Sequence, residues 1–299
     1  MKVLTAADVR RTVSMPAAID AVRQGFLELA AGNFVLPPRQ IFGDGAVLVM
    51  SAYHSPTGTA VVKKIGINLD QVPAIRATVI WTGGGEQLVA DGTSITTLRT
   101  GAVVGVATDL LARPDATRLA LIGTGAQAAD QVRAVLAVRR IATVTITGRN
   151  LGRATALAKA LAAEFPTVSF TPTTSIDDAI ATPDIICCAT SSATPLFDAD
   201  ALPQTVHINA IGAFRPTMRE LPRNLLATAD LVMVDQREAA VDESGEIIDA
   251  LAAGVVQESE LLELGKALTT TPSPTGRTVF KSVGIGCQDW SIAKALAEY

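Results

Sequence analysis

Residues 122–128 read Ile122-Gly123-Thr124-Gly125-Ala126-Gln127-Ala128, and this stretch decides the fold class. It follows a short apolar segment at 119–122 and begins a helical pattern that runs to Val138. In this G-x-G-x-x-A pattern the first Gly allows a tight turn, the second lets the backbone approach a pyrophosphate, and the small third residue permits close helix–strand packing. The helix N-terminus adds free N–H groups and a favourable dipole. The pattern predicts a dinucleotide site made by Gly123, Gly125 and Ala126, and the alternative is an ordinary strand–helix turn.

The residues that follow alternate between helix and strand patterns. Helices are expected over 126–138 and 151–165. Short apolar segments rich in β-branched residues predict strands over 119–122, 143–147, 168–171, 185–189, 206–210 and 231–234. This alternation is typical of a parallel sheet covered by helices on both faces. The fold class is therefore α/β, with a Rossmann dinucleotide-binding domain.

The N-terminal part of the chain has a different pattern. Segments rich in Val, Ile and Tyr predict an antiparallel meander with strands over 46–53, 59–67 and 75–82. Gly83-Gly84-Gly85 is the clearest turn, and a long helix is expected over 94–112. This part is therefore an α+β domain with an antiparallel sheet. The boundary lies near 113–117, and residues 278–299 fit either part.

The composition excludes several classes of function. Of the 299 residues, 25 are Lys or Arg and 29 are Asp or Glu, and the net charge of -4 argues against a nucleic-acid or anionic-membrane partner. The 2 His and 3 Cys residues argue against a multi-His metal site and a disulfide framework, so no metal is expected. Every apolar stretch is shorter than the about 18 residues of a membrane span, and the N-terminus lacks a signal-peptide pattern. We therefore expect a cytoplasmic enzyme.

The rare His and Cys residues have structural interpretations. Cys187 and Cys188 are adjacent within an apolar strand, which is typical of buried thiols rather than of a redox pair. His54 follows a strand and His207 lies within one. Each is a candidate acid or base, but a structural role is the favoured interpretation.

The end of the second Rossmann strand distinguishes the two nicotinamide dinucleotides. An NAD-binding domain usually carries Asp or Glu there, to hold the ribose hydroxyls. Here Thr147 is followed by Gly148-Arg149-Asn150, with Arg153 close behind. Because an Arg can clamp a 2′-phosphate, Arg149 and Arg153 predict NADP(H) in preference to NAD(H), which stays an alternative. The other interpretation of Arg149 is a solvated side chain at a helix start.

A few cations of the N-terminal part have apolar surroundings. Arg39 follows two prolines, Lys63 and Lys64 lie within an expected strand, and Arg99 lies on an otherwise apolar helix. Neighbouring residues of a strand point to opposite faces, so one of the two lysines is expected to face inward.

A buried cation needs an anionic partner, and two kinds of partner are open. A substrate carboxylate would supply the charge for Arg99 and the inward lysine. The alternative is that Arg99 and Lys63 pair with protein carboxylates such as Asp91 or Asp109.

Several motifs run in the same order as in one known family. They extend across nearly the whole chain: Pro38-Arg39, Met50-Ser51-Ala52-Tyr53, Lys63, Asp91-Gly92, Leu98-Arg99-Thr100-Gly101-Ala102, residues 121–128, Asn209-Ala210-Ile211-Gly212, Arg219-Glu220-Leu221, Val279-Phe280-Lys281-Ser282-Val283-Gly284 and Asp289. On these residues the chain resembles the ornithine cyclodeaminase/mu-crystallin family. The combination is far more specific than any single motif.

The resemblance implies a subunit with two domains. Residues 1–114 and 277–299 would form a substrate-binding and dimerisation domain, and residues 115–276 the Rossmann domain. Members of the family are homodimers, so a homodimer is expected.

The resemblance also assigns roles to site residues. It implies that Arg39, Lys63 and Arg99 bind the carboxylate of the substrate. The positions that match cofactor contacts in relatives are Thr100, Gln127, Arg149, Asn150, Thr190 and Val283.

The sequence departs from the cyclodeaminase pattern at two places. Cyclodeaminases carry an acid just before a Met-Pro pair, where this chain has Leu48 and Val49 before Met50-Ser51. They also carry a catalytic Asp at the position that Phe214 occupies here. Cyclising ornithine needs acid–base groups to handle its amines, so the chain resembles the reductase branch of the family instead.

Members of that branch reduce cyclic ketimines such as Δ1-pyrroline-2-carboxylate and Δ1-piperideine-2-carboxylate to proline and pipecolate. The expected function is therefore NAD(P)H-dependent reduction of a small cyclic imino acid, with the hydride supplied by the cofactor. Three alternatives stay open: an amino-acid dehydrogenase acting on alanine or a similar substrate, an ornithine cyclodeaminase, and a mu-crystallin-like binding protein with little turnover.

Overall fold

The computed structural model describes residues 1–68 and 75–299 and divides them into two units. Unit 1 consists of Met1–Val103 and Ile285–Tyr299, and unit 2 of Val104–Gly284. The sequence analysis places the boundary at 114 and assigns 277–284 to the first part. In the structure the change of unit falls inside a helix, and 277–284 belongs to unit 2 because Thr278–Lys281 is an inner strand of the unit 2 sheet.

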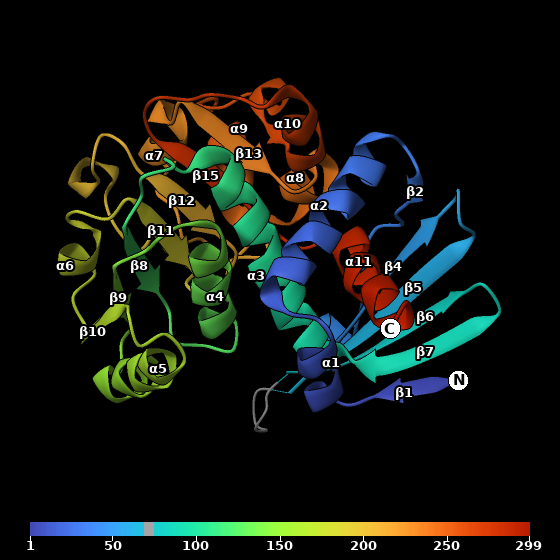
Figure 1. Ribbon diagram of the computed structural model, residues 1–299. Helices are drawn as coiled ribbons and strands as arrows, with labels where there is room; N and C mark the ends of the chain where they lie inside the picture. The colour runs from blue at the N-terminus through green and yellow to red at the C-terminus, as the bar shows by residue number, and fades with distance from the viewer. Residues whose placement is uncertain (69–74) are drawn as a thin grey trace. The chain divides into compact units, whose positions relative to one another are not determined.

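Unit 1 is built on a seven-stranded sheet with the order β1-β7-β6-β5-β4-β2, in which β3 also pairs with β4 (Figure 1). The strands are β1 (Lys2–Leu4), β2 (Phe34–Val35), β3 (Gln40–Phe42), β4 (Val47–His54), β5 (Thr59–Ile67), β6 (Ile75–Gly83) and β7 (Glu86–Asp91). Neighbours from β4 to β7 are antiparallel, so the predicted meander is confirmed. Strand β1 adds a parallel partner beside β7.

The two faces of this sheet differ in what covers them. One face carries a row of buried side chains in register across four strands: Met50, Lys63, Val79 and Ala90. Helix α11 (Gly286–Ala297) packs on β4, β5 and β6, and α2 (Met15–Ala30) packs against α11. The next row along the strands lies on the opposite face: Ser51, Val62, Ile80 and Val89. On that face Val62 and Ile80 are exposed.

Local capping explains where the first helices begin. Thr5 and Asp8 form a reciprocal capping box at α1 (Ala6–Thr12), and the Ser14 hydroxyl accepts from the Ala17 N–H at the start of α2. Helix α3 (Gly92–Leu111) begins directly after β7, where the Asp91 carboxylate accepts from the Ser94 N–H at 2.7 Å. These contacts satisfy N–H groups that a helix leaves without partners at its first turn.

Unit 2 is built on an eight-stranded sheet in which every pair is parallel. Its order is β10-β9-β8-β11-β12-β15-β13-β14. The strands are β8 (Arg118–Ile122), β9 (Thr143–Thr147), β10 (Ser169–Thr173), β11 (Ile185–Cys188), β12 (His207–Ala210), β13 (Leu231–Val234), β14 (Leu262–Glu263) and β15 (Thr278–Lys281). Counted along the chain from β8, the first five strands of the sheet have the order 3-2-1-4-5 of a Rossmann fold. After β10 the next strand, β11, is added on the other side of β8, so the strand order reverses between β8 and β11.

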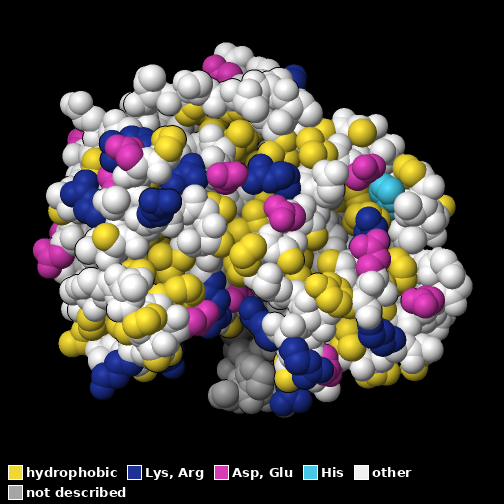
Figure 2. All heavy atoms as spheres, viewed as in Figure 1, with side chains coloured by type: hydrophobic (Ala, Val, Ile, Leu, Met, Phe, Trp, Pro, Cys, Tyr) yellow, Lys and Arg dark blue, Asp and Glu magenta, His cyan; other side chains and the backbone are white. Residues whose placement is uncertain are grey.

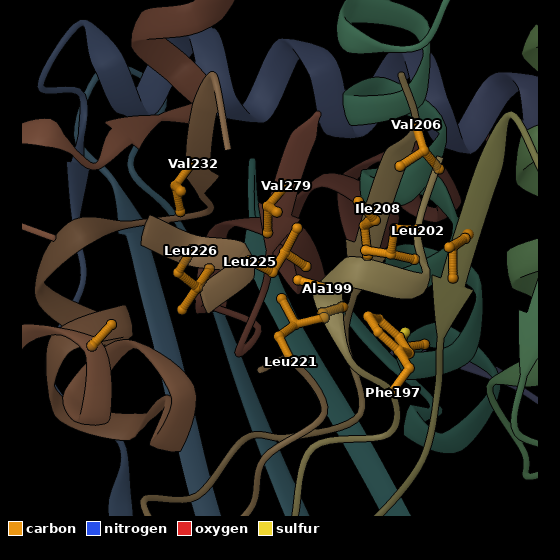
Figure 3. Packing of buried hydrophobic residues seen from close by; sticks show 14 of the residues in the cluster. Phe197, Ala199, Leu202, Val206, Ile208, Leu221, Leu225, Leu226, Val232 and Val279 are labelled. Carbon is orange, nitrogen blue, oxygen red and sulfur yellow. The ribbon is translucent and has the colours of Figure 1, made fainter. Parts of the chain in front are cut away.

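Helices connect these strands and bury their apolar side chains. They are α4 (Ala128–Val138), α5 (Leu151–Glu164), α6 (Ile176–Ile180), α7 (Arg223–Thr228), α8 (Arg237–Glu243), α9 (Gly245–Ala252) and α10 (Leu264–Thr270). Figure 3 shows one part of the core, where Ile208, Val279 and Val232 of three neighbouring strands lie near Leu225 and Leu226 of α7. The predicted α/β fold with a Rossmann-like sheet and an antiparallel sheet is confirmed.

The surface carries both signs of charge. On the face drawn in Figure 2, Lys and Arg side chains lie among Asp, Glu and hydrophobic side chains. Within the described ranges, no helix has the length and apolar character needed to cross a bilayer.

Candidate active site

A buried cluster in unit 1 joins three elements that lie far apart in the sequence. Lys63 comes from β5, Arg99 from α3 and Asp289 from α11. The Lys63 ammonium lies 2.8 Å from Oδ1 and 2.7 Å from Oδ2 of Asp289, and Arg99 Nε lies 3.6 Å from Oδ1. All three side chains are buried. Two cations therefore share one carboxylate, which leaves an excess of positive charge in a region of low dielectric.

The charge state of Lys63 follows from these surroundings. Burial lowers the pKa of Lys63 to about 7, against the attraction of Asp289, and the positive charges of Arg99 and Arg39 lower it further. Arg39 precedes β3 and is partly buried. The electrostatic effect of Arg39 on Lys63 indicates that the three predicted carboxylate-binding cations act on one another within unit 1.

The structure decides which lysine faces inward and which carboxylate pairs with it. Lys63 is fully buried and Lys64 is exposed. The alternative that Lys63 and Arg99 pair with a protein carboxylate is confirmed, but the carboxylate is Asp289 and not one of the two named examples, Asp91 and Asp109. Asp91 caps α3, and Asp109 pairs with Arg139 at 3.1 Å.

Gln288, next to Asp289 on α11, completes the cluster. Its side-chain Oε1 accepts a hydrogen bond from Nη1 of Arg99, and Gln288 is fully buried. Its Nε2 group makes no hydrogen bond to any residue that the structure describes. A donor of this kind, buried beside two cations, suits a carboxylate ligand.

The glycine-rich loop of unit 2 lies at the carboxyl end of β8. Gly123 has φ +117°, and a Cβ there would come within 2.4 Å of the Ala189 carbonyl oxygen. A Cβ at Gly125 would meet no described atom within 4 Å, and α4 begins three residues later with the buried Ala128. The residues present fit a dinucleotide: the first Gly makes the turn, the second leaves room for a phosphate, and the helix N-terminus faces that room.

The loops after neighbouring strands are tied to one another at this edge of the sheet. Gly148 after β9 approaches Thr124 after β8, and Gly212 after β12 is packed against the Thr190 backbone after β11. Two buried carboxylates, Glu220 and Asp235, bind these loops through backbone N–H groups. Asp235 accepts from the N–H groups of Val283 and Gly284 at 3.0 and 2.8 Å, and from the Ser282 hydroxyl at 2.7 Å.

The remaining predicted cofactor residues lie at several places. Arg149 and Arg153 are exposed beyond the end of β9, and neither forms an ion pair with a described carboxylate. Asn150 caps α5, and its Oδ1 accepts from the Arg153 N–H at 3.0 Å. Thr190 follows β11 in unit 2. Thr100 lies in unit 1 on α3, where its hydroxyl donates to the Thr96 carbonyl at 2.6 Å.

The His and Cys residues have structural surroundings. Burial lowers the pKa of His207 to about 3, and its ring nitrogens contact Thr278 Oγ1 at 2.8 Å and Asn209 Oδ1 at 3.2 Å. His54 packs against Trp290 and contacts Glu28. Burial raises the pKa of the Cys187 thiol to about 12. Within the described ranges, no group of three or more His, Cys, Asp and Glu residues is placed to hold a metal ion.

The comparisons with known proteins agree with this geometry. A model of the ornithine cyclodeaminase/mu-crystallin family matches residues 1–299. The chain belongs to this family. A Δ1-pyrroline-2-carboxylate reductase from Bacillus cereus is 39% identical over 222 residues, which cover 72% of this chain and 67% of the relative.

Two solved structures extend the likeness over the full length of this chain. A Δ1-pyrroline-2-carboxylate reductase from Thermococcus litoralis, in complex with NADH and L-proline, has a TM-score of 0.93 and 28% identity, and covers 100% of this chain and 97% of that chain. An archaeal alanine dehydrogenase dimer with bound NAD has a TM-score of 0.90 and 29% identity, and covers 100% and 95%. The predicted family is confirmed.

Sequence reasoning missed the partners of the residues it singled out. Asp289 and Glu220 stood in motifs without a role, and Gln288 and Asp235 were not considered. A signal existed for Asp289 alone, since it is the single acid of the C-terminal helix, and an acid at a buried position needs a cation.

Proposed function

We propose that this family member uses NAD(P)H to reduce the C=N bond of a small cyclic imino acid. The substrates are Δ1-pyrroline-2-carboxylate or Δ1-piperideine-2-carboxylate, and the products are L-proline or L-pipecolate. The observation that carries the proposal is the pair of buried cations, Lys63 and Arg99, sharing the single carboxylate of Asp289. The Bacillus cereus and Thermococcus litoralis relatives, both described as Δ1-pyrroline-2-carboxylate reductases, support it.

The residues of unit 1 bind and orient the substrate in this proposal. Arg39, Lys63 and Arg99 hold its carboxylate, and each charged hydrogen bond contributes roughly 1.5–3 kcal/mol. Bound dinucleotide supplies the hydride. A protonated cyclic imine is already electrophilic at carbon, so positioning is the main task of these side chains. Unit 2 holds the dinucleotide through Gly123, Gly125, Ala126 and Gln127.

The direct test is turnover by the purified protein. We expect NAD(P)H oxidation on addition of Δ1-pyrroline-2-carboxylate or Δ1-piperideine-2-carboxylate, and formation of the corresponding cyclic amino acid. Binding of the dinucleotide without reduction of either ketimine would contradict the reductase proposal and favour a small-molecule binding role. Release of ammonia from ornithine would instead show cyclodeaminase activity, which Phe214 in place of a catalytic Asp argues against.

A second candidate is an amino-acid dehydrogenase. The observation in its favour is the likeness to the archaeal alanine dehydrogenase, with a TM-score of 0.90. An open-chain 2-oxo acid carries the same carboxylate that Lys63 and Arg99 would bind. Reduction of pyruvate in the presence of ammonia, faster than reduction of either cyclic ketimine, would establish this candidate in place of the first.

For the cofactor, NADP(H) is the proposed preference. Arg149 and Arg153 are exposed beyond β9 and have no described carboxylate partner, so both guanidinium groups can meet a 2′-phosphate. Because the two solved relatives hold NADH and NAD, NAD(H) is the competing cofactor. The ratio of the Michaelis constants for NADPH and NADH decides between them.

A homodimer through the uncovered face of the unit 1 sheet is the proposed assembly. Ser51, Val62, Ile80 and Val89 form a continuous row on that face, and Val3 extends the row in register with Val89. Val3, Val62 and Ile80 are 65%, 41% and 45% exposed, an apolar strip that a second copy would cover. Sedimentation of Ile80→Lys should show monomers. Leu151→Lys, an equal change at an exposed residue of unit 2, should stay dimeric.

A further inference from the structure

Glu220 is a fully buried carboxylate that collects four donors from two loops. Its Oε1 accepts from the N–H of Thr190 at 2.6 Å and from the Thr190 hydroxyl at 2.9 Å. Its Oε2 accepts from the N–H groups of Gly212 at 2.7 Å and Ala213 at 3.3 Å. Thr190 follows β11 and Gly212 follows β12, so one side chain joins the carboxyl ends of two neighbouring strands.

The four donors around Glu220 favour its ionised form. Burial raises the pKa of its carboxyl group, and Lys281 and the Thr190 N–H oppose that rise. The carboxylate accepts from all four donors, whereas a protonated carboxyl would have to turn its O–H to the Thr190 hydroxyl and reverse that hydrogen bond, because the other three neighbours are N–H groups that only donate. Lys281 also donates to the Ala213 carbonyl at 2.5 Å and pairs with Glu246 at 2.9 Å, which adds a second side-chain contact to the loop after β12.

The carboxylate determines what the Thr190 hydroxyl can do. The hydroxyl proton is given to Glu220, and one lone pair accepts from the Ser192 N–H at 3.2 Å. A hydroxyl oxygen has two lone pairs, so Thr190 Oγ1 keeps one and can act toward a ligand only as an acceptor. The backbone of Glu220 holds the same loop, since its carbonyl accepts from the Leu196 N–H at 2.9 Å.

We propose that Glu220 is a positioning residue for the nicotinamide half of the dinucleotide, acting through Thr190. Thr190 lies two residues after the end of β11, beside the point where the strand order reverses, and ligands of such sheets bind outside the carboxyl ends of the strands there. With its proton committed to Glu220, Oγ1 accepts from a donor on the nicotinamide nucleoside. The two donors of that kind are the carboxamide N–H₂ and the ribose hydroxyls.

The test compares four variants of the full chain, one of them the conservative Thr190→Ser. Glu220→Gln replaces one accepting oxygen by an N–H₂ group, which cannot accept from the N–H or O–H donors that face it. Thr190→Val replaces the hydroxyl by a methyl group and keeps the shape of the side chain. Asp184→Asn is the matched control. Asp184 is also buried and accepts from two backbone N–H groups, Thr117 at 2.9 Å and Arg118 at 3.0 Å, but at the amino end of β8.

Binding is measured by fluorescence titration with two probes. One is the preferred reduced dinucleotide, and the other is ADP, or ADP that carries a 2′-phosphate if NADPH is preferred. We expect Thr190→Val to raise the Kd for the dinucleotide about three- to tenfold and Glu220→Gln at least about tenfold, with the ADP probe affected less than twofold. Thr190→Ser should restore wild-type affinity. Asp184→Asn should lower the Tm and leave both Kd values unchanged. Equal losses for both probes, or dinucleotide affinity like wild type in Glu220→Gln and Thr190→Val, would overturn the proposal.

An analogue then identifies the donor. The reduced 3-acetylpyridine dinucleotide lacks the carboxamide N–H₂ but keeps the ribose hydroxyls. A Thr190→Val penalty that disappears with this analogue assigns the contact to the carboxamide, and one that persists assigns it to the ribose. The inference rests only on the dinucleotide-binding part of the proposed function. A protein that binds the dinucleotide and reduces neither ketimine would refute the reductase and leave the role of Glu220 standing. A wild-type chain that binds no dinucleotide would refute both.

Discussion

The two units build their halves of the proposed chemistry from different materials. In unit 1, long charged side chains from β5, α3 and α11 meet in a buried cluster around Asp289. In unit 2, the backbone forms most of the proposed binding site, at Gly123 and Gly125 and in loops whose N–H groups donate to Glu220. The difference follows from the ligands. A carboxylate needs fixed positive charge, whereas a pyrophosphate is held by N–H groups and requires the absence of a side chain.

Removing charge from unit 1 should have the largest effect. Lys63→Met should lower kcat/KM for the cyclic ketimine roughly a thousandfold or more, because Arg99 alone would then face Asp289 and the cluster would lose the excess positive charge that binds the substrate carboxylate. The same variant should lose about 3–5 kcal/mol of unfolding free energy, since a buried carboxylate loses the ammonium that lies 2.7 and 2.8 Å from its two oxygens. Steady-state kinetics and denaturant unfolding measure the two losses.

A double variant separates the two losses. Lys63→Met combined with Asp289→Asn removes both charges, and its stability should return toward wild type while its activity stays low. Recovery of activity along with stability would mean that Lys63 serves only to neutralise Asp289, and the charge-built description of unit 1 would fail.

The backbone-built half should respond to an added methyl group. Gly125→Ala places a Cβ where no described atom lies within 4 Å, so the fold should tolerate it. That space is where a phosphate would approach, so the Kd for the dinucleotide should rise about a hundredfold. Gly123→Ala should destabilise the fold as well, because its Cβ would come within 2.4 Å of a carbonyl oxygen at φ +117°. Wild-type affinity in Gly125→Ala would place the pyrophosphate elsewhere.

The same difference explains what could be read from the sequence. The dinucleotide loop is a contiguous pattern between a strand and a helix, so residues 122–128, together with the strand–helix alternation around them, predict the Rossmann fold and a dinucleotide site. The unit 1 cluster depends on the register of the antiparallel strands and on a helix far along the chain. Gln288 on that helix lies 189 positions after Arg99. The strand period showed that Lys63 and Lys64 face opposite ways, but only packing decides which face α11 covers. Likewise, no local pattern places 278–281 between β12 and β13.

The pH dependence of substrate binding should report the unit 1 cluster. The pKa of Lys63 is lowered to about 7, so the ammonium that attracts the carboxylate is lost as the pH rises through this value. KM for the ketimine should therefore increase above pH 7, by up to tenfold per pH unit, while KM for the dinucleotide stays flat. Asp289→Asn removes the charge that opposes the lowering, so the increase should begin at lower pH. A KM for the ketimine that is flat from pH 6 to 9 would show that Lys63 does not contact the carboxylate.

Arg149 tests the contrast between the two units, because at this position unit 2 would bind the cofactor with a charged side chain. Arg149→Asp should lower the preference for NADPH over NADH about tenfold, since it removes a 2′-phosphate clamp and supplies an acceptor for ribose hydroxyls. The effect is the smallest of the set because Arg149 is exposed, where water screens its charge. Lys159→Asp makes the same charge change at an exposed position of α5 and should leave the ratio unchanged. A clear preference for NADH that Arg149→Asp does not alter would mean that unit 2 selects its cofactor by backbone and shape alone, and the two units would then differ more sharply than their described contacts suggest.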